Sequence, residues 1–370
     1  MNLDHLPYGS AMIDGRRVAL VRLDDEHAAQ LNGPLFADGS LDALLAAGRD
    51  TWATTRAEIR QAVERESLPV VNLADVALVL PFTVADYVDF YASEQHATNV
   101  GRMFRPDGDA LTPNWKHLPI GYHGRSGTVV VSGTDIKRPQ GQARGAEGAI
   151  TFGPSQRLDI EAEVGFVVGT GSTLGSPVSV RAFSEHVFGI CLLNDWSARD
   201  IQAWEYVPLG PFLGKSFATS VSAWVTPLSA LNFAWTAPPE RDPKPLPYLD
   251  DGDATCGLDL QLEVRLNGDV ISRPPFATMY WTGAQMLAHM TVNGASLRTG
   301  DLFASGTVSG PERDQFGSML ELSWGGRDPI ALSDGSTRTF LLDGDEVTIT
   351  ATAPGPNGPI TLGDVSGRIV

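Results

Sequence analysis

Cysteine is scarce in this chain of 370 residues, which contains only Cys191 and Cys256. Two cysteines are too few for the disulfide framework that holds many small secreted domains together. No apolar run approaches the roughly 18–20 residues that are needed to cross a bilayer. The N-terminal residues also lack the charged-then-apolar layout of a secretory signal. These absences argue against a membrane protein and predict a cytoplasmic location.

Positive charge is scarce as well. The chain has 27 Lys and Arg against 44 Asp and Glu, which gives a formal net charge of −17. Binding to nucleic acid requires clustered Lys and Arg to neutralise phosphates, and no basic block occurs in the sequence. We therefore expect no nucleic-acid partner.

The N-terminal region predicts a small unit of its own. Its patterns indicate a strand over Arg17–Arg22, a helix over Leu41–Arg65 and an apolar segment at Val76–Leu80. Pro81 marks the end of this segment, because proline cannot donate the hydrogen bond that would continue a regular element.

The rest of the chain is rich in Gly and Pro, and most of its apolar residues alternate with period two, which predicts a mainly β fold. Asn267-Gly268 is a strong hairpin signal, since both residues of such a turn need a positive φ. Loops 106–127 and 208–216 are long and aromatic, as functional loops often are. The expected strands are Thr128–Val131, Leu158–Val168, Leu258–Leu266, Asp301–Ala304, Met319–Trp324 and Glu346–Ala351, and the expected short helices are Val84–Ser93, Val180–Phe188 and Ala284–Thr291.

Acidic residues in one of these strands suggest a metal site. Glu161 and Glu163 alternate with apolar neighbours, so they project from the same face, about 6–7 Å apart. A half-buried strand with a solvated acidic face gives the same pattern. Asp195, however, directly follows the apolar run Phe188–Leu193. With Asp89, these acids offer an all-oxygen site suited to Mg²⁺, Ca²⁺ or Mn²⁺, although spacing alone does not show that they converge.

Five long motifs resemble the fumarylacetoacetate hydrolase family and occur in the family's order. They are Asp89-Phe-Tyr-Ala-Ser-Glu-Gln-His96-Ala-Thr-Asn-Val-Gly, Pro113-Asn-Trp-Lys-His-Leu-Pro-Ile-Gly-Tyr-His-Gly-Arg125, Asn194-Asp-Trp-Ser-Ala-Arg-Asp-Ile-Gln202, Trp204-Glu-Tyr-Val-Pro-Leu-Gly-Pro-Phe-Leu-Gly-Lys-Ser-Phe217 and Ser305-Gly-Thr-Val-Ser-Gly-Pro311. The likeness covers nearly the whole chain after about residue 80 and is weaker before it.

The resemblance implies a fold and an assembly. The expected fold is an N-terminal SH3-like small barrel over residues 1–82 followed by a catalytic β-roll over residues 83–370, usually assembled as a homodimer. It also implies a divalent cation, Mg²⁺ or Ca²⁺ with Mn²⁺ as a further option. Its ligands would be Asp89, Glu161, Glu163 and Asp195.

Lys215 and Thr219 match family positions near a second or alternative magnesium contact. An ammonium group has no lone pair to give to a metal. Lys215 is therefore better suited to bind substrate oxygens or the charge of the transition state.

The implied reaction is the hydrolysis of a carbon–carbon bond in a β-diketo acid, fumarylacetoacetate, to fumarate and acetoacetate, the last step of tyrosine breakdown. By match to the family, His96 is the general base and Glu321 orients it. Arg199, Gln202 and Lys215 complete the electrophilic side, while Tyr91, Arg105, Gln202, Tyr206 and Thr307 match substrate-contacting positions.

Each role has an ordinary alternative. A lone His is more often a surface or helix-end residue than a base, and His123 is a rival base on chemistry alone. Glu321 alternates with apolar residues, which also describes an exposed strand acid. At the level of the whole chain, the alternatives are another enzyme of the superfamily, such as an acylpyruvate hydrolase, an oxaloacetate decarboxylase or a hydratase, and a non-catalytic β module with a structural cation.

Overall fold

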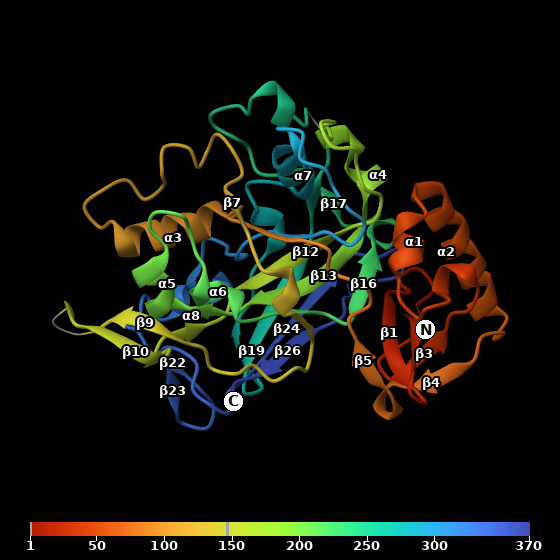
Figure 1. Ribbon diagram of the computed structural model, residues 1–370, viewed down its shortest axis with the longest axis horizontal. Coiled ribbons are helices and arrows are strands. Elements are labelled where there is room, and N and C mark those ends of the chain that lie inside the picture. The colour runs from red at the N-terminus through yellow and green to blue at the C-terminus, as the bar shows by residue number, and fades with distance from the viewer. Residues whose placement is uncertain (1, 146–147, 253) are drawn as a thin grey trace.

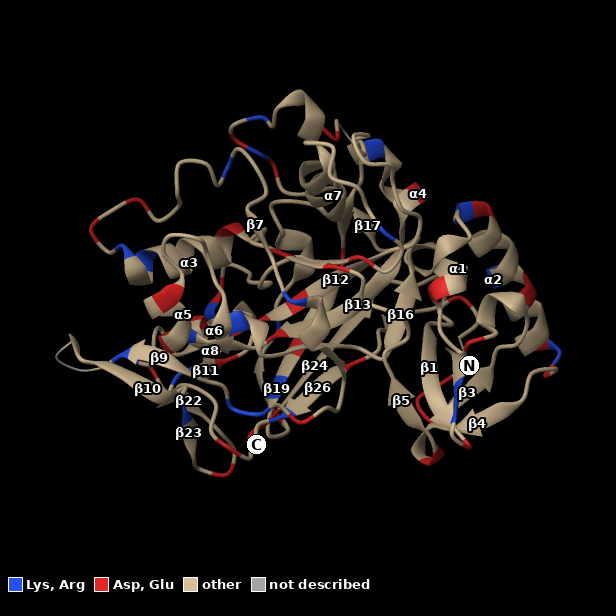
Figure 2. Ribbon diagram, in the orientation of Figure 1, with Lys and Arg blue, Asp and Glu red and all other residues tan. Residues whose placement is uncertain are grey.

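The computed structural model describes residues 2–145, 148–252 and 254–370. The fold is mainly β, as predicted, and short helices lie around two larger sheets (Figure 1). In the described part of the chain, no helix is long and apolar enough to cross a membrane. Lys and Arg are interspersed with Asp and Glu over the elements (Figure 2).

The larger sheet runs through both halves of the chain. Its main path follows the order β4-β3-β2-β1-β16-β13-β12-β21-β6-β7, while β5, β15 and β8 pair beside that path. Its strands are β1 Tyr8–Ile13, β2 Arg16–Arg22, β3 His27–Gln30, β4 Val70–Asn72, β5 Ala77–Val79, β6 Tyr87–Phe90, β7 Gly121–His123, β8 Val129–Val131, β12 Ala162–Val168, β13 Val187–Asp195, β15 Thr219–Val221, β16 Trp224–Pro227 and β21 Leu302–Ala304.

A second sheet has the order β20-β19-β24-β25, with β26 also paired to β24. Its strands are β19 Gln261–Leu266, β20 Asp269–Ser272, β24 Glu346–Ala353, β25 Ile360–Thr361 and β26 Val365–Arg368. The predicted hairpin is confirmed, because β19 and β20 are antiparallel and the turn residues Asn267 and Gly268 have φ values of 52° and 89°. The remaining short pairs join β9 Gln140–Arg144 to β10 Ile150–Pro154, β11 Leu158–Asp159 to β14 Ser197–Ala198, β17 Trp235–Thr236 to β18 Gly257–Leu258, and β22 Ile330–Ala331 to β23 Thr337–Arg338.

The helices are short apart from one in the N-terminal region, where α1 and α2 lie beside β1–β5 (Figure 1). They are α1 Asp42–Ala46, α2 Arg49–Glu64, α3 Glu94–Phe104, α4 Phe183–His186, α5 Arg199–Glu205, α6 Leu213–Ser216, α7 Gly283–Thr291 and α8 Met319–Leu322.

Six sequence predictions need correction. The strand expected at 158–168 is divided into β11 and β12, and the strand expected at 258–266 is divided into β18 and β19. The helix expected at 41–65 is two helices, because Gly48 adopts φ 84° between them. The segment expected as a helix at 84–93 contains β6 instead, and α3 begins only after Ser93, whose hydroxyl accepts the backbone N–H of His96. The helix expected at 180–188 is a 3-10 turn at Val180–Ala182 followed by α4, which ends at His186, and β13 begins at Val187. The strand expected at 319–324 is α8.

The longest fully buried strands of the larger sheet are β12 and β13. All residues of β12 and β13 are buried, and both strands lie in the middle of the larger sheet. Phe166 of β12 stacks on Phe303 of β21, with ring centroids 5.0 Å apart. Aromatic pairs of this kind add to the burial of apolar area. The acids at the ends of these strands are therefore held on a rigid base.

Candidate active site and metal centre

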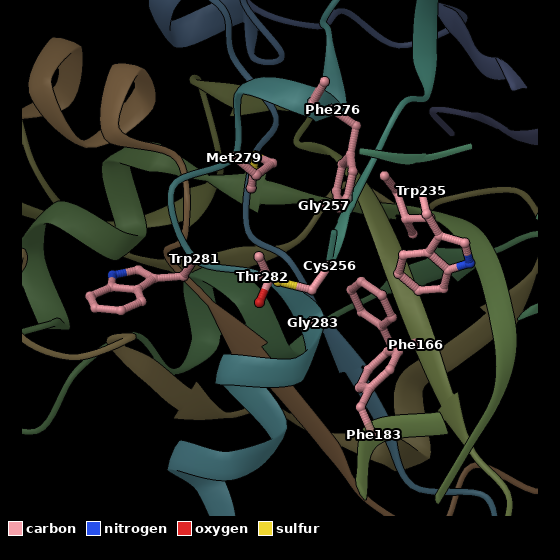
Figure 3. Close-up of a pocket in the computed structure, with 12 residues that line it drawn as sticks. Phe166, Phe183, Trp235, Cys256, Gly257, Phe276, Met279, Trp281, Thr282 and Gly283 are labelled. Atoms are coloured by element: carbon pink, nitrogen blue, oxygen red, sulfur yellow. The ribbon is translucent and has the colours of Figure 1, made fainter. Parts of the chain in front are cut away.

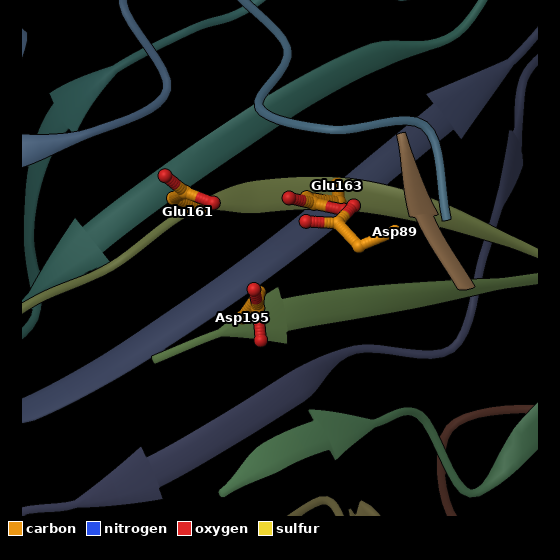
Figure 4. A group of neighbouring side chains, drawn as sticks. All are labelled: Asp89, Glu161, Glu163 and Asp195. Carbon is orange, nitrogen blue, oxygen red and sulfur yellow. The ribbon is translucent and has the colours of Figure 1, made fainter. Parts of the chain in front are cut away.

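Four acids converge at the ends of neighbouring strands. Asp89 lies on β6, Glu161 between β11 and β12, Glu163 on β12, and Asp195 at the last position of β13. Each offers an oxygen within 4.8 Å of the others, and all four side chains are buried. Figure 4 shows the carboxylates turned toward one another from three separate strand segments. The predicted convergence is confirmed, and the alternative of a solvated acidic face is wrong.

Strand pairing explains the convergence. β12 and β13 are antiparallel with Ala162 opposite Asn194, and the backbone N–H of Asp195 donates to the carbonyl of Glu161 over 3.1 Å. β21 lies on the other side of β12 and pairs in parallel with β6, which places Ala304 beside Asp89. The turn after β21 adds a contact, since the N–H of Gly306 donates to Glu163 Oε2 over 3.1 Å.

The electrostatics of the cluster differ among its members. Burial, followed by the negative charges of neighbouring acids, raises the pKa of Asp89 and of Glu163 well above the ordinary range. Burial also opposes ionisation of Glu161, but Lys215 and Arg199 outweigh it and lower the pKa of this carboxyl. The site therefore contains one well-compensated carboxylate and two that lack positive charge.

Two oxygen atoms identify where positive charge is missing. Asp89 Oδ1 and Glu163 Oε1 are buried and have no hydrogen-bond partner in the described structure. Buried polar atoms without a partner are rare and call for an explanation. A hard divalent cation would satisfy both, because its preferred ligands are carboxylate oxygens. The residues present thus fit such an ion.

Lys215 and Arg199 are the cations of the site. Lys215 Nζ donates to Glu161 Oε2 and, over 2.8 Å, to Asp195 Oδ2. Arg199 Nη2 lies 2.8 Å from Glu161 Oε1. The second nitrogen of the guanidinium fork, Nη1, donates to Gln202 Oε1 over 3.2 Å, and Nε donates to Asp159 Oδ2 over 2.8 Å. Arg199 and Glu161 thus form an ion pair, and Nη2 carries two N–H groups, of which one contact to Glu161 can engage only one.

Asp195 carries further contacts. Thr219 Oγ1 donates to Asp195 Oδ1 over 2.8 Å, and the Tyr122 hydroxyl donates to Asp195 Oδ2 over 2.9 Å. Burial and then the charge of Asp195 raise the pKa of Tyr122 well above the ordinary range, so its hydroxyl stays a donor. These bonds fix the orientation of a carboxylate that would otherwise rotate about its χ angles.

A second centre joins His96 to Glu321. His96 Nδ1 lies 2.6 Å from Glu321 Oε2, and both side chains are buried. Glu321 also accepts from Asn99 Nδ2 over 2.9 Å, from Ser309 Oγ over 3.0 Å and from Ser318 Oγ over 2.8 Å. Burial opposes ionisation of Glu321, but His96 and these donors lower its pKa below the ordinary value. Burial excludes a surface histidine and an exposed strand acid, whereas His96 does lie at the start of α3, as the helix-end alternative describes.

The two centres are adjacent. The charge of His96 helps to lower the pKa of Glu161. The ring of Tyr91 packs edge-on against His96 with centroids 5.4 Å apart. Burial and then the charges of Glu321 and Glu161 raise the pKa of Tyr91. Tyr91 therefore packs on His96 and lies near enough to Glu321 and Glu161 for their charges to act on its hydroxyl.

The other predicted substrate contacts differ in how closely the structure ties them to this site. Gln202 Oε1 accepts from Arg199 Nη1 over 3.2 Å, and Thr307 Oγ1 is buried without a partner in the described structure. Arg105 Nη2 bonds the carbonyl of Ala110 over 2.6 Å, while its charge acts on Tyr91. Tyr206 is 51 % exposed, at the end of α5, and the structure shows no contact between its side chain and the acids in the described residues.

Three cavities differ in which residues line them. A cavity of about 10 Å³ is lined mainly by aromatic and aliphatic side chains such as Phe166, Phe183 and Trp235 (Figure 3), and it has room for about one water molecule. A groove of about 1000 Å³ beside α2 contains none of the predicted site residues. By contrast, Tyr122, Asp195, Lys215 and Thr219 line a cavity of about 330 Å³, which is large enough for a small acid.

The sequence prediction missed several members of the site, namely Asn99, Tyr122, Asp159, Ser309 and Ser318. One signal was present for Ser318, because Ser-x-x-Glu before an apolar run is a helix-start motif. Asp159 continues the alternation of Glu161 and Glu163. A single hydroxyl such as Ser309 has no recognisable pattern in one sequence.

The chain is similar to known proteins over most of its length. Residues 86–370 match the family model described as "Fumarylacetoacetate (FAA) hydrolase C-terminal". The chain belongs to the fumarylacetoacetate hydrolase family. The resemblance inferred from its motifs is thereby confirmed.

Relatives in this family are similar over most of their length. A human fumarylacetoacetase is 48% identical over 354 residues, which cover 91% of this chain and 84% of the relative. A fumarylacetoacetase of Caenorhabditis elegans is 43% identical over 401 residues, covering 100% of this chain and 96% of the relative. A solved structure of fumarylacetoacetate hydrolase from psychrophilic Exiguobacterium antarcticum has a TM-score of 0.61 at 17% identity, with 98% of this chain and 99% of that one covered. The last likeness concerns the fold alone.

Proposed function

We propose that this chain hydrolyses fumarylacetoacetate to fumarate and acetoacetate. The observation that carries the proposal is the buried His96–Glu321 pair beside the cluster of four acids. A structural cation needs only the acids, whereas a base held by a carboxylate serves proton transfer. The similarity to curated fumarylacetoacetases supports the choice of substrate.

His96 takes the proton of the attacking water at Nε2, because Nδ1 is engaged by Glu321. The hydroxyl adds to the carbonyl carbon next to the bond that breaks, and this carbon becomes the new carboxyl group of fumarate. The other fragment departs as an enolate, and the proton that His96 took from water is returned to it to give acetoacetate. Glu321 stabilises the imidazolium that His96 becomes when it takes the proton of the water.

The electrophilic side consists of Arg199, Gln202 and Lys215. Arg199 Nη2 has a second N–H beyond the one that its ion pair with Glu161 can engage, and Lys215 Nζ has a third N–H beyond its two carboxylate bonds. Both can therefore bind oxygens on which negative charge grows. Tyr91, Arg105, Tyr206 and Thr307 would contact the rest of the substrate, and the unpartnered hydroxyl of Thr307 supports this role.

Asp89, Glu161, Glu163 and Asp195 would hold a divalent cation, Mg²⁺ or Ca²⁺ with Mn²⁺ as a further option. When bound, such an ion supplies Lewis-acid withdrawal of charge from the β-diketone oxygens. Lys215 and Thr219, which bond Asp195, would orient this ligand rather than replace it. The identity of the ion is tested by calorimetric titration of the chelated protein with each metal in turn.

The assembly and the finer fold belong to the same proposal. We propose an N-terminal SH3-like barrel over residues 1–82, a catalytic β-roll over residues 83–370, a homodimer and a cytoplasmic location. The family match that begins at residue 86 supports such a division. Light scattering coupled to gel filtration measures the oligomeric state directly.

The central experiment is an assay of purified protein on fumarylacetoacetate beside acylpyruvates and oxaloacetate, with and without a chelator. Preferred turnover of fumarylacetoacetate that the chelator abolishes is the expected result. Preference for an acylpyruvate or for oxaloacetate decarboxylation would assign the chain to a different activity of the superfamily. Inactivity on all of them would favour a binding module.

A further inference from the structure

Asp159 is a buried acid outside the four-acid cluster. It lies on β11, is 0% exposed, and accepts four hydrogen bonds. Its Oδ2 accepts from Arg199 Nε over 2.8 Å and from the N–H of Leu320 over 3.1 Å. Its Oδ1 accepts from the N–H groups of Met319 and of Ile160, each over 2.8 Å.

These donors belong to two different parts of the site. Met319 and Leu320 open α8, the helix that carries Glu321 and thereby holds His96. Arg199 opens α5 and pairs with the metal-ligand candidate Glu161. A single carboxylate thus connects the helix of the histidine–carboxylate pair with the arginine of the electrophilic side.

We propose that Asp159 is a positioning residue that sets the distance and orientation between the Glu321–His96 pair and Arg199. The inference rests on the proposed function, which gives these two groups their roles. Reacting groups must be held within about 0.5 Å of the productive geometry. Asp159 serves this purpose because both of its oxygens are committed and its surroundings are packed.

Asp159→Asn tests the proposal, since it keeps the size of the side chain but removes its charge and turns one acceptor into a donor. We expect kcat on fumarylacetoacetate to fall about 10–100-fold, as for other residues that orient catalytic groups. KM and the affinity for Mg²⁺ should stay unchanged, because the variant keeps every proposed direct contact with substrate and metal.

Asp200→Asn is the matched control. Asp200 is the chain neighbour of Arg199, but it accepts from Ser155 Oγ over 2.6 Å and from the N–H of Gln156 over 2.7 Å, away from the site. Its substitution should leave kcat close to the unmodified value. An equal loss in both variants would show a general weakening of α5 and overturn the proposal.

A double-mutant cycle separates positioning from a purely structural role. If Asp159 acts in part through Arg199, Asp159→Asn should cost less kcat in an Arg199→Lys background, where the guanidinium fork is already lost, than in the unmodified protein. Full multiplication of the two losses would overturn the proposal. Asp159→Glu provides a second variant that keeps the charge and displaces the carboxylate by one methylene, and unchanged kcat in it would also overturn the proposal.

Nitrogen NMR of the arginine side chains gives a readout without substrate. The Arg199 Nε–H should exchange slowly with solvent in the unmodified protein and faster in Asp159→Asn. Unchanged exchange would refute the link between these residues. Failure of the unmodified protein to cleave fumarylacetoacetate, with this exchange effect intact, would refute the proposed function instead.

Discussion

His96 Nδ1 and Glu321 Oε2 lie 2.6 Å apart although 225 residues separate them in the chain. The contact leaves Nε2 of the imidazole as the nitrogen that faces other partners, and it fixes the tautomer through an ionised acceptor. Four donors converge on Glu321, so the carboxylate cannot easily turn away from His96.

Replacing His96 by Ala should abolish turnover but keep the fold and metal binding. General-base catalysis contributes about 10²–10⁴-fold, and loss of a residue that acts as a unit with others can exceed this range. Steady-state kinetics measure the loss of turnover, and calorimetric titration with Mg²⁺ measures whether metal binding is kept. His123→Ala is the comparison variant, because His123 lines the same cavity as Asp195 and Lys215 but is exposed, whereas Glu321 bonds His96. Greater loss in His123→Ala would make that residue the base.

Replacing Glu321 by Gln should lower kcat by about 10²–10⁴-fold, since the imidazolium loses its counter-charge. The change should also alter acid stability. The pKa of Glu321 is lowered in the folded chain. Its ionisation therefore stabilises the fold above the unfolded pKa of about 4.3, and this contribution disappears as the pH falls through the folded value. The stability difference between variant and unmodified protein, measured by urea unfolding, should shrink below about pH 4. A difference independent of pH would contradict the assignment.

Divalent metal should bind more tightly as the pH rises. Asp89 and Glu163 have raised pKa values in the metal-free protein and must release protons to become ligands.

Because these pKa values are raised in the folded chain, the metal-free fold should lose stability as the pH rises above the unfolded pKa of about 4. Mg²⁺ at 100 times its Kd should restore about 2.7 kcal/mol. Calorimetry in buffers of different ionisation enthalpy measures the protons released, and Glu163→Gln should reduce that number. Proton release of zero at every pH would argue against this ligand set.

The turn after β21 should tolerate no side chain. Gly306 has φ 74°, and a Cβ there would lie 2.2 Å from the carbonyl oxygen of Phe90. Gly306→Ala should therefore destabilise the protein by about 1–3 kcal/mol and displace Asp89, which precedes Phe90. Gly153→Ala on β10 is the control, since a Cβ there meets nothing within 4 Å. Thermal unfolding and Mg²⁺ affinity measure the two effects, and equal behaviour of both variants would contradict the strain argument.

Local pattern predicted some parts of the site and missed others for physical reasons. The alternation of acids with apolar residues predicts that Glu161 and Glu163 lie on the same side of the chain, and both join the cluster although Glu161 lies between β11 and β12. Asp89 reaches them through the pairing of β6 with β21, a long-range contact that no local period encodes. The resemblance supplied it instead. The sequence predicts a strand at Glu321, because a short apolar run fits the period of a strand as well as that of a helix. The Ser318 cap, whose hydroxyl accepts the N–H of Glu321, distinguishes the helix from the strand.

The parallel pairing of β6 with β21 also determines when the site can form. Asp89 belongs to the first quarter of the chain, but its partner strand spans Leu302–Ala304. Closing so long a loop is slow, because its entropy must be lost before the contacts form. Because β21 lies near residue 300, most of the polypeptide must be synthesised before β6 can pair with it and hold Asp89 beside the other three acids. Until then, the nascent chain has no metal centre that a cellular cation could occupy.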